Sequence, residues 1–275
     1  MIVELISVGT EILLGDILNT NVQYLSKRLA HMGMNVYFHT TVGDNPERIR
    51  SCLDIAFSRS DMVIMTGGLG PTKDDLTKEM LMEYFGKTPV FDQKAFDMME
   101  KRLEKFGHFT ISDSLRKQAY VPSDSLILYN YHGTAPGCVM EKDGKACILL
   151  PGPPKEMEPM FEQACEEYLS RYCDHTFVSV NIKMIDKDHA PLSIVGEGPC
   201  ADRLDEILDG SNPTTATYAK EDGCLIRITA SAKDHDTARA MIEPVLKQCI
   251  DRLGAAYIRR VYEEEGEDIP WQTGN

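Results

Sequence analysis

The sequence predicts an α/β fold, a three-layer arrangement with a parallel-type sheet between helices, followed by a second, smaller α+β domain. Two observations predict the first part: apolar, often β-branched runs alternate with helical periodicities, and each run ends in a polar loop that contains glycine. A new order after about residue 171, namely strand, helix, two strands, helix and strand, predicts the second. We therefore expect one domain over residues 1–170, a split βαβ domain over 171–262, and an acidic tail or linker over 263–275.

The first two strands are expected at residues 2–8 and 35–42. Gly9-Thr10-Glu11 follows the first strand and Gly43-Asp44 follows the second. Between the strands, apolar residues recur at helical spacing up to Gly33, which predicts an amphipathic helix. Another helix is expected directly after the second strand, where an asparagine precedes a proline.

The stretch over residues 61–79 carries the strongest chemical signal. Its apolar strand runs into a glycine loop, and Asp74 and Asp75 stand where a helix is expected to begin. Turned backbone N–H groups and a helix dipole of about half a positive charge suit a bound phosphate. Two carboxylates would repel that phosphate unless a hard divalent cation lay between them. The stretch predicts a metal-bridged phosphate site, although its glycine spacing fits neither a Walker nor a Rossmann loop.

Three polar loops are expected to converge on this site. Parallel strands present their carboxyl ends at one edge of the sheet, where such folds bind their ligands. The loops that follow the first three strands are Gly9-Thr10-Glu11, Gly43-Asp44 and residues 66–75. Their convergence favours a functional site over three unrelated turns.

A second strand, loop and helix start follow an expected hairpin near residues 138–150. Two helices and a short strand are expected before it, at 96–106, 112–119 and 126–128. The hairpin runs into Pro151-Gly152-Pro153-Pro154, and a helix then begins with Lys155 and Glu156 in its first turn. Lys155 is placed to neutralise a phosphate, whereas a lone lysine on a helix is more often solvated.

The second domain contains no obvious catalytic cluster. Its strands are expected at 177–185, 214–218, 224–230 and 255–262, and its helices at 197–208 and 236–253. The region is acid-rich and lacks the basic GXXG loop of an RNA-binding KH domain. We expect a structural or assembly role.

Composition disfavours nucleic acid and membrane partners. The chain has 43 acidic against 29 basic residues, a net charge of -14, so its overall field repels a polyanion. No run approaches the roughly 18 apolar residues of a membrane span, and no basic segment opens the chain as a signal peptide would. The eight cysteines include no C-x-x-C pair, and we expect them to be reduced and structural in a cytoplasmic protein.

Five motifs in a fixed order resemble the CinA (competence/damage-inducible protein A) family. They are Gly9-Thr-Glu-Ile-Leu-Leu-Gly-Asp-Ile-Leu-Asn-Thr-Asn21, Thr41-Val-Gly-Asp44, Thr66-Gly-Gly-Leu-Gly-Pro-Thr-Lys-Asp-Asp-Leu-Thr77, Gly133-Thr-Ala-Pro-Gly137 and Leu150-Pro-Gly-Pro-Pro-Lys-Glu-Met157. The resemblance implies a Mog-like, molybdopterin-binding-like first domain. After residue 171 the chain resembles the family's small KH-like domain, with Ser211-Asn-Pro-Thr214 and Arg227-Ile-Thr-Ala230 as weaker markers.

The resemblance also implies an activity for the first domain. This is the metal-dependent hydrolysis of ADP-ribose to AMP and ribose 5-phosphate, an ADP-ribose pyrophosphatase of nicotinamide-nucleotide metabolism. Full-length relatives continue into a nicotinamide-nucleotide amidase domain that this sequence lacks, so its deamidation is not carried over. Family relatives are dimeric, and we expect a homodimer acting on a small nucleotide.

Site residues follow from the motifs as a hypothesis. Asp44 and Asp75, with Asp74, would hold Mg2+, with Mn2+ or Co2+ as alternatives, and either Glu11 or Glu156 would act as general base. The alternative for Asp74 and Asp75 is helix capping. Residues expected to bind the substrate and its phosphates are Gly9, Thr10, Asn21, Thr66, Gly67, Gly68, Gly70, Thr72, Gly152 and Lys155.

Two other functions remain open. One is nucleotidyl transfer like that of molybdopterin adenylyltransferases, which would need ATP and the pterin. The other is a non-catalytic nucleotide-binding module that serves a separate nicotinamide mononucleotide amidase.

Overall fold

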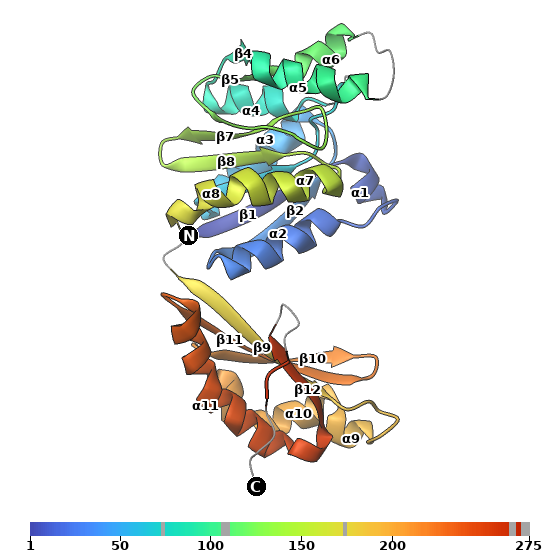
Figure 1. The fold of residues 1–275 in the computed structure, drawn as a ribbon, viewed down its shortest axis with the longest axis vertical. Coiled ribbons are helices and arrows are strands. Elements are labelled where there is room, and N and C mark those ends of the chain that lie inside the picture. The colour runs from blue at the N-terminus through green and yellow to red at the C-terminus, as the bar shows by residue number, and fades with distance from the viewer. Residues whose placement is uncertain (73–74, 106–110, 173–174, 264–267, 271–275) are drawn as a thin grey trace. The chain divides into compact units, whose positions relative to one another are not determined.

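The computed structural model describes residues 1–72, 75–105, 111–172, 175–263 and 268–270. The chain divides into two compact units (Figure 1). The first comprises Met1–Ala30 with Met34–Tyr172, and the second comprises His31–Gly33 with Cys173–Asn275. Each unit has its own sheet and core.

The sheet of the first unit has six strands in the order β2-β1-β3-β8-β7-β6. The first four of these run parallel to one another, whereas β7 and β6 are antiparallel additions at one side. The strands are β1 (Ile2–Val8), β2 (Asn35–Val42), β3 (Met62–Thr66), β6 (Leu126–Leu128), β7 (Gly137–Lys142) and β8 (Lys145–Leu150). The predicted α/β class is confirmed, with a mixed sheet.

The sheet combines parallel and antiparallel strands because of the predicted hairpin. Asp143 and Gly144, with φ of 53° and 75°, form the turn between β7 and β8. A connection of two residues can only join antiparallel strands, so β8 lies parallel to β3 while β7 must reverse.

Helices cover both faces of this sheet (Figure 1). On one face, α3 (Pro46–Arg59) and α4 (Thr77–Phe85) bury an apolar cluster that includes Ile6, Leu53 and Leu81. On the other face lie α2 (Thr20–His31) and α7 (Pro154–Met160), and α7 continues through a π-helical turn at Phe161–Cys165 and α8 (Glu166–Leu169). The expected three layers are therefore present.

The register sets the edge at which the site forms. Val8 pairs with Val42, and Thr66 pairs with both Ser7 and Leu150. The carboxyl ends of β1, β2, β3 and β8 therefore lie next to one another. The loops that follow all four strands emerge at the same edge.

Several short elements of the first unit were not predicted. The loop after β1 contains a one-turn helix, α1 (Thr10–Leu14), which ends at the left-handed Gly15. A two-stranded ribbon of β4 (Pro89–Phe91) and β5 (Tyr120–Pro122) had no sequence signal, because three-residue strands show no periodicity. The two helices between them are α5 (Gln93–Glu104) and α6 (Asp113–Lys117).

The second unit has the predicted strand and helix order. Its antiparallel sheet runs β10-β11-β9-β12, and α10 and α11 pack against it around a core that includes Val180, Ile226 and Ile242. The main elements are β9 (Thr176–Met184), α10 (Glu197–Leu204), β10 (Thr214–Lys220), β11 (Gly223–Ala232), α11 (His235–Leu253) and β12 (Ile258–Glu263). A short helix, α9 (Leu192–Val195), was not predicted.

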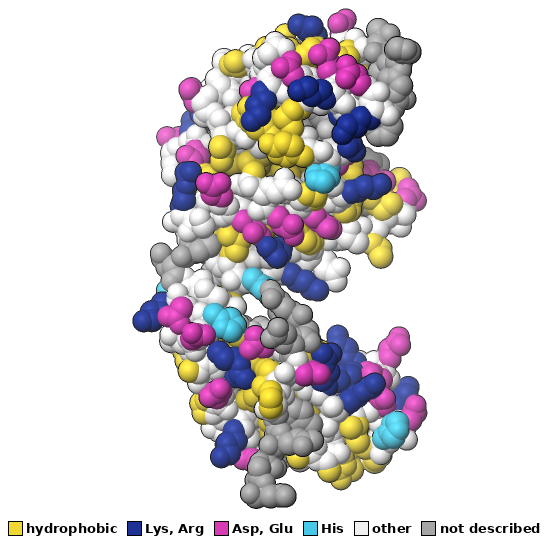
Figure 2. All heavy atoms as spheres, in the orientation of Figure 1, with side chains coloured by type: hydrophobic (Ala, Val, Ile, Leu, Met, Phe, Trp, Pro, Cys, Tyr) yellow, Lys and Arg dark blue, Asp and Glu magenta, His cyan; other side chains and the backbone are white. Residues whose placement is uncertain are grey.

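The cysteines, the surface charges and the helix lengths can each be compared with the composition. Every cysteine in the described part of the chain is a free thiol, and burial raises the pKa of Cys138 to about 12. Acidic and basic side chains occur beside one another on the face drawn in Figure 2. Within the described residues, no helix is both long and apolar enough to span a membrane.

Candidate functional site

A cavity of about 610 Å³ opens at the carboxyl edge of the four parallel strands in the first unit. This volume is typical of small-molecule sites, which span roughly 300 to 1,000 Å³. The loops after β1, β2, β3 and β8 all contribute to its lining, together with the start of α2. The sequence-predicted residues among those that line it are Gly9, Glu11, Asn21, Asp44, Thr66, Gly67, Gly68, Gly70, Thr72, Asp75, Gly152 and Glu156.

The glycine loop after β3 passes too close to its neighbours for side chains. Gly67 has a φ of 99°, and a Cβ there would lie 2.1 Å from the carbonyl oxygen of Val8. At Gly70 a Cβ would lie 2.4 Å from Oδ2 of Asp75. Glycine is thus required both for the left-handed turn and for the close approach of the Asp75 carboxylate.

Threonines orient the two described aspartates of the predicted metal site. Oδ2 of Asp44 accepts from the backbone N–H of Thr10 at 3.0 Å and from its hydroxyl at 2.8 Å. Oδ2 of Asp75 accepts from the N–H of Thr72 at 3.0 Å and from its hydroxyl at 2.6 Å. Each carboxylate keeps its second oxygen free of protein donors within the described residues.

Helix capping does not account for Asp75. The helix α4 begins at Thr77, and its N-cap is Leu76, which makes no side-chain capping bond. Asp75 instead accepts hydrogen bonds from Thr72, three residues earlier, and so stabilises a tight turn within the loop. Asp74 lies outside the described residues.

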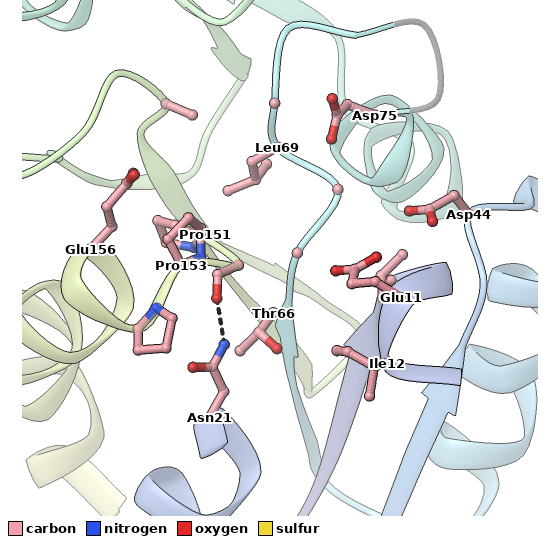
Figure 3. A pocket seen from close by; sticks show the side chains of 18 of the residues that line it. Glu11, Ile12, Asn21, Asp44, Thr66, Leu69, Asp75, Pro151, Pro153 and Glu156 are labelled. Atoms are coloured by element: carbon pink, nitrogen blue, oxygen red, sulfur yellow. Dashed lines mark hydrogen bonds between the residues drawn. The ribbon is translucent and has the colours of Figure 1, made fainter. Parts of the chain in front are cut away.

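Glu11 and Glu156, the two predicted alternatives for a general base, lie on different walls. In Figure 3, Glu11 lies with Asp44 and Asp75 on one side of the pocket, and Glu156 rises from α7 on the other. We call Glu11, Asp44 and Asp75 the acidic group. The arrangement places one of the two glutamates beside the predicted metal ligands.

Asn130, whose side-chain amide makes four hydrogen bonds, holds the Glu156 carboxylate. Asn130 accepts from the N–H groups of His132 and Gly133, and it donates to the Ala135 carbonyl at 2.9 Å and to Glu156 Oε2 at 2.8 Å. A Cβ on Gly133 would lie 1.7 Å from the same carboxylate oxygen. The loop before β7 therefore fixes where this carboxylate lies.

Two buried amides line the cavity with one unused acceptor each. Asn21 is 7% exposed and donates from Nδ2 to the Gly152 carbonyl at 2.7 Å, which leaves Oδ1 without a partner in the described structure. Gln118 is 4% exposed and donates to the Leu69 carbonyl at 2.9 Å, which leaves Oε1 likewise unpartnered. Buried acceptors of this kind are costly unless a ligand or water supplies a donor.

Some residues lie elsewhere than expected, and one was missed. Thr10 and Lys155 do not line the cavity: Thr10 acts through Asp44, and the exposed Lys155 lies outside the lining on α7. Sequence reasoning missed Gln118, which follows α6 and reaches the glycine loop from 49 residues away. Its backbone carbonyl accepts from Lys78, and burial lowers the pKa of that lysine.

The oxygen donors fit a hard cation. Mg2+ at phosphate sites is commonly held by one or two carboxylates together with substrate oxygens and waters. Asp44 and Asp75 supply such carboxylates, whereas no cluster of three or more His, Cys, Asp or Glu suited to a metal occurs among the described residues. Two carboxylates alone would leave the other coordination positions of such a cation to water or to other ligands.

Comparisons with known proteins agree with this architecture. Residues 4–171 match the family model for a probable molybdopterin binding domain, and residues 194–258 match that for the damage-inducible protein CinA KH domain. A CinA-like protein of Dictyoglomus turgidum (strain DSM 6724 / Z-1310) is 49% identical over 91% of this chain and 59% of its own length. A putative competence-damage inducible protein of Clostridium novyi (strain NT) is 46% identical over the same shares, so the chain spans 59% of the length of these relatives.

The chain is also similar to a protein of known structure. The protein CinA with unknown function from Thermoplasma acidophilum is 34% identical, with a TM-score of 0.55. The match covers 61% of this chain and 98% of that one. It extends the likeness from sequence to three dimensions.

Proposed function

The chain belongs to the CinA family, and we propose that its first domain hydrolyses the diphosphate of ADP-ribose to AMP and ribose 5-phosphate. The observation that carries the proposal is the pairing of a glycine loop with the acidic group in one cavity. Backbone amides of such a loop suit a phosphate, while carboxylates next to a phosphate require a cation. A diphosphate bound together with a divalent metal meets both requirements.

In this proposal the carboxylates of the acidic group have two roles, metal binding and proton transfer. Asp44 and Asp75 hold Mg2+, with Mn2+ or Co2+ as alternatives, and when bound the metal polarises the phosphoryl oxygens. Thr10 and Thr72 orient these carboxylates through the oxygen that each threonine contacts. Glu11 lies beside them and takes the proton of the attacking water as the phosphoanhydride bond breaks and the departing phosphate keeps the bonding electrons.

The glycine loop positions the diphosphate. Gly67, Gly68 and Gly70 line the cavity, and Thr72, whose hydroxyl donates to Asp75, lines it at the loop's end. The Gln118 amide holds the Leu69 carbonyl and so fixes the loop before substrate arrives. Positioning and electrostatics are the main catalytic effects available for phosphoryl transfer.

The test is release of AMP from ADP-ribose by the purified chain. We expect release with Mg2+, Mn2+ or Co2+, none with EDTA, and a large loss in Asp44→Asn. A Glu47→Gln variant, altered at an exposed position of α3 outside the cavity lining, serves as the matched control. Absence of AMP with every metal would refute the proposal.

Nucleotidyl transfer is the second candidate, and the match to a probable molybdopterin binding domain favours it. The same loop and carboxylates suit an adenylate in either chemistry. Incubation with ATP and molybdopterin separates the two, because transfer yields an adenylylated pterin and pyrophosphate, whereas hydrolysis needs only ADP-ribose and water.

A further inference from the structure

The cavity wall across from the acidic group presents mainly hydrogen-bond acceptors. We propose that this acceptor wall, made of residues 151–154, Glu156 and Asn21, binds free hydroxyl groups of a sugar ring. The inference rests on the proposed function, because it names the part of the diphosphate substrate that faces this wall. It also gives Glu156 a binding role instead of that of the general base.

Asn21 contributes a fixed acceptor. In Figure 3 its side chain reaches from the start of α2 to the turn that follows β8, where Nδ2 donates to the Gly152 carbonyl at 2.7 Å. A carbonyl accepts only from the NH2 end of an amide, so this bond sets which end of Asn21 is the oxygen. Oδ1 is therefore the remaining group, and it has no partner in the described structure.

Glu156 is a second acceptor on the same wall. One of its oxygens accepts from Asn130, whose amide is fully used by four hydrogen bonds. No basic side chain pairs with Glu156 in the described part of the chain. Its other oxygen is thus available to a ligand donor, and Gly133 leaves the space that the carboxylate fills.

The turn between these two side chains is poor in donors. Pro151, Pro153 and Pro154 have no backbone N–H, and the N–H of Glu156 is used by the Pro153 carbonyl at 3.0 Å. A phosphate needs donors or cations, and the only basic residue of this turn and helix start, Lys155, does not line the cavity. The wall is therefore suited to a neutral group that donates.

Sugar hydroxyls meet these requirements. Two hydroxyl groups of one sugar ring offer two O–H donors, and Glu156 and Asn21 each present an acceptor, one on either side of the turn at residues 151–154. A carboxylate that accepts from ribose hydroxyls is an established solution in nucleotide sites of other folds. With the diphosphate held between the glycine loop and the acidic group, an attached ribose would extend toward this wall.

Calorimetry with a methylene-bridged ADP-ribose analogue, which resists hydrolysis, tests the proposal in the presence of Mg2+. We expect Glu156→Gln to weaken binding of the analogue roughly tenfold or more, since bonds to a charged acceptor are the stronger ones. Gly133→Ala should show the same loss, because its Cβ displaces the carboxylate without removing it. Glu158→Gln, on the same helix but outside the cavity lining, should bind as the wild type does.

Methylenediphosphonate, which has no sugar, is the comparator, and we expect neither variant to bind it more tightly than the wild type. Tighter binding in Glu156→Gln would mean that a phosphate faces this wall, and would overturn the proposal. Equal affinity of the wild type and Glu156→Gln for the sugar-bearing analogue would also overturn it, as would a wild type that does not bind the analogue. Failure of the proposed hydrolysis is seen separately, as absence of AMP release while the variants still differ in affinity.

Discussion

Asp75→Asn separates a chemical role of the carboxylate from a structural one. In the structure, Oδ2 of Asp75 accepts two hydrogen bonds from Thr72, at 3.0 and 2.6 Å. An asparagine keeps one acceptor oxygen, so both bonds can persist, while the negative charge and the free carboxylate oxygen are lost. The change is nearly isosteric, so the contact with Gly70 stays unaltered.

The two effects differ in size. Hydrogen bonds to a charged acceptor contribute about 1 kcal/mol more each than bonds to a neutral one, so two bonds at a half-buried site set a limit of about 2 kcal/mol on the stability lost. Loss of a carboxylate that holds the metal should slow turnover by on the order of 100-fold or more, which corresponds to about 2.7 kcal/mol of transition-state stabilisation. Asp75→Asn should therefore lose most of its turnover while the protein remains folded.

The assay combines AMP release under Mg2+ with thermal unfolding of the same preparations. Thr72→Val is the matched variant: it removes the hydroxyl bond to Asp75 but leaves the carboxylate, so turnover should fall far less than in Asp75→Asn. If Asp75→Asn hydrolyses ADP-ribose at the wild-type rate, the metal role of this residue is wrong. Unfolding of the variant at the assay temperature would instead assign Asp75 to the stability of the loop.

Three further predictions concern the supports of the site. Gly70→Ala should lower AMP release at least tenfold with little change in melting temperature, because its backbone φ suits alanine while the new Cβ displaces the Asp75 carboxylate; a wild-type rate would contradict the close approach. Thr10→Val should raise the Mg2+ concentration needed for half-maximal turnover about tenfold, and Thr10→Ser should restore it, because the hydroxyl orients Asp44; equal values for both variants would exclude that role. Burial lowers the pKa of Lys78, so between that pKa and the ordinary 10.5 the unfolded chain binds more protons than the folded chain. The free energy of unfolding should therefore increase with pH in this range. Chemical denaturation between pH 8 and 10.5 should show this increase in the wild type and not in Lys78→Met.

The parallel half of the fold and the convergence of its loops were predictable because both follow from local pattern. Apolar runs with β-branched residues define β1, β2 and β3, and parallel pairing then requires their following loops to share an edge. The hairpin of β7 and β8 was also predicted, yet its consequence, a mixed sheet with a fourth loop at the same edge, depends on β8 pairing with β3. No local pattern specifies which earlier strand a hairpin joins.

The division of the carboxylates between two walls could not be predicted for the same reason. Glu11 and Glu156 each follow a strand and a glycine, so the sequence treats them alike. Their difference comes from the loop that holds Glu156, where Asn130 lies 26 residues earlier in the chain. Gln118 is a similar case, since its role appears only when α6 and the glycine loop are brought together.

The charge distribution of the cavity connects these observations. Glu11, Asp44, Asp75 and Glu156 all line it, and none forms an ion pair with a basic side chain in the described part of the chain. A diphosphate entering such a cavity alone would face repulsion from both walls, with only the glycine loop to attract it. In the proposed complex, a divalent cation on the acidic group would remove the repulsion on one side, and a neutral sugar on the acceptor wall would avoid it on the other. A substrate with its charge at the centre and its hydroxyl groups at one end would therefore match the whole cavity.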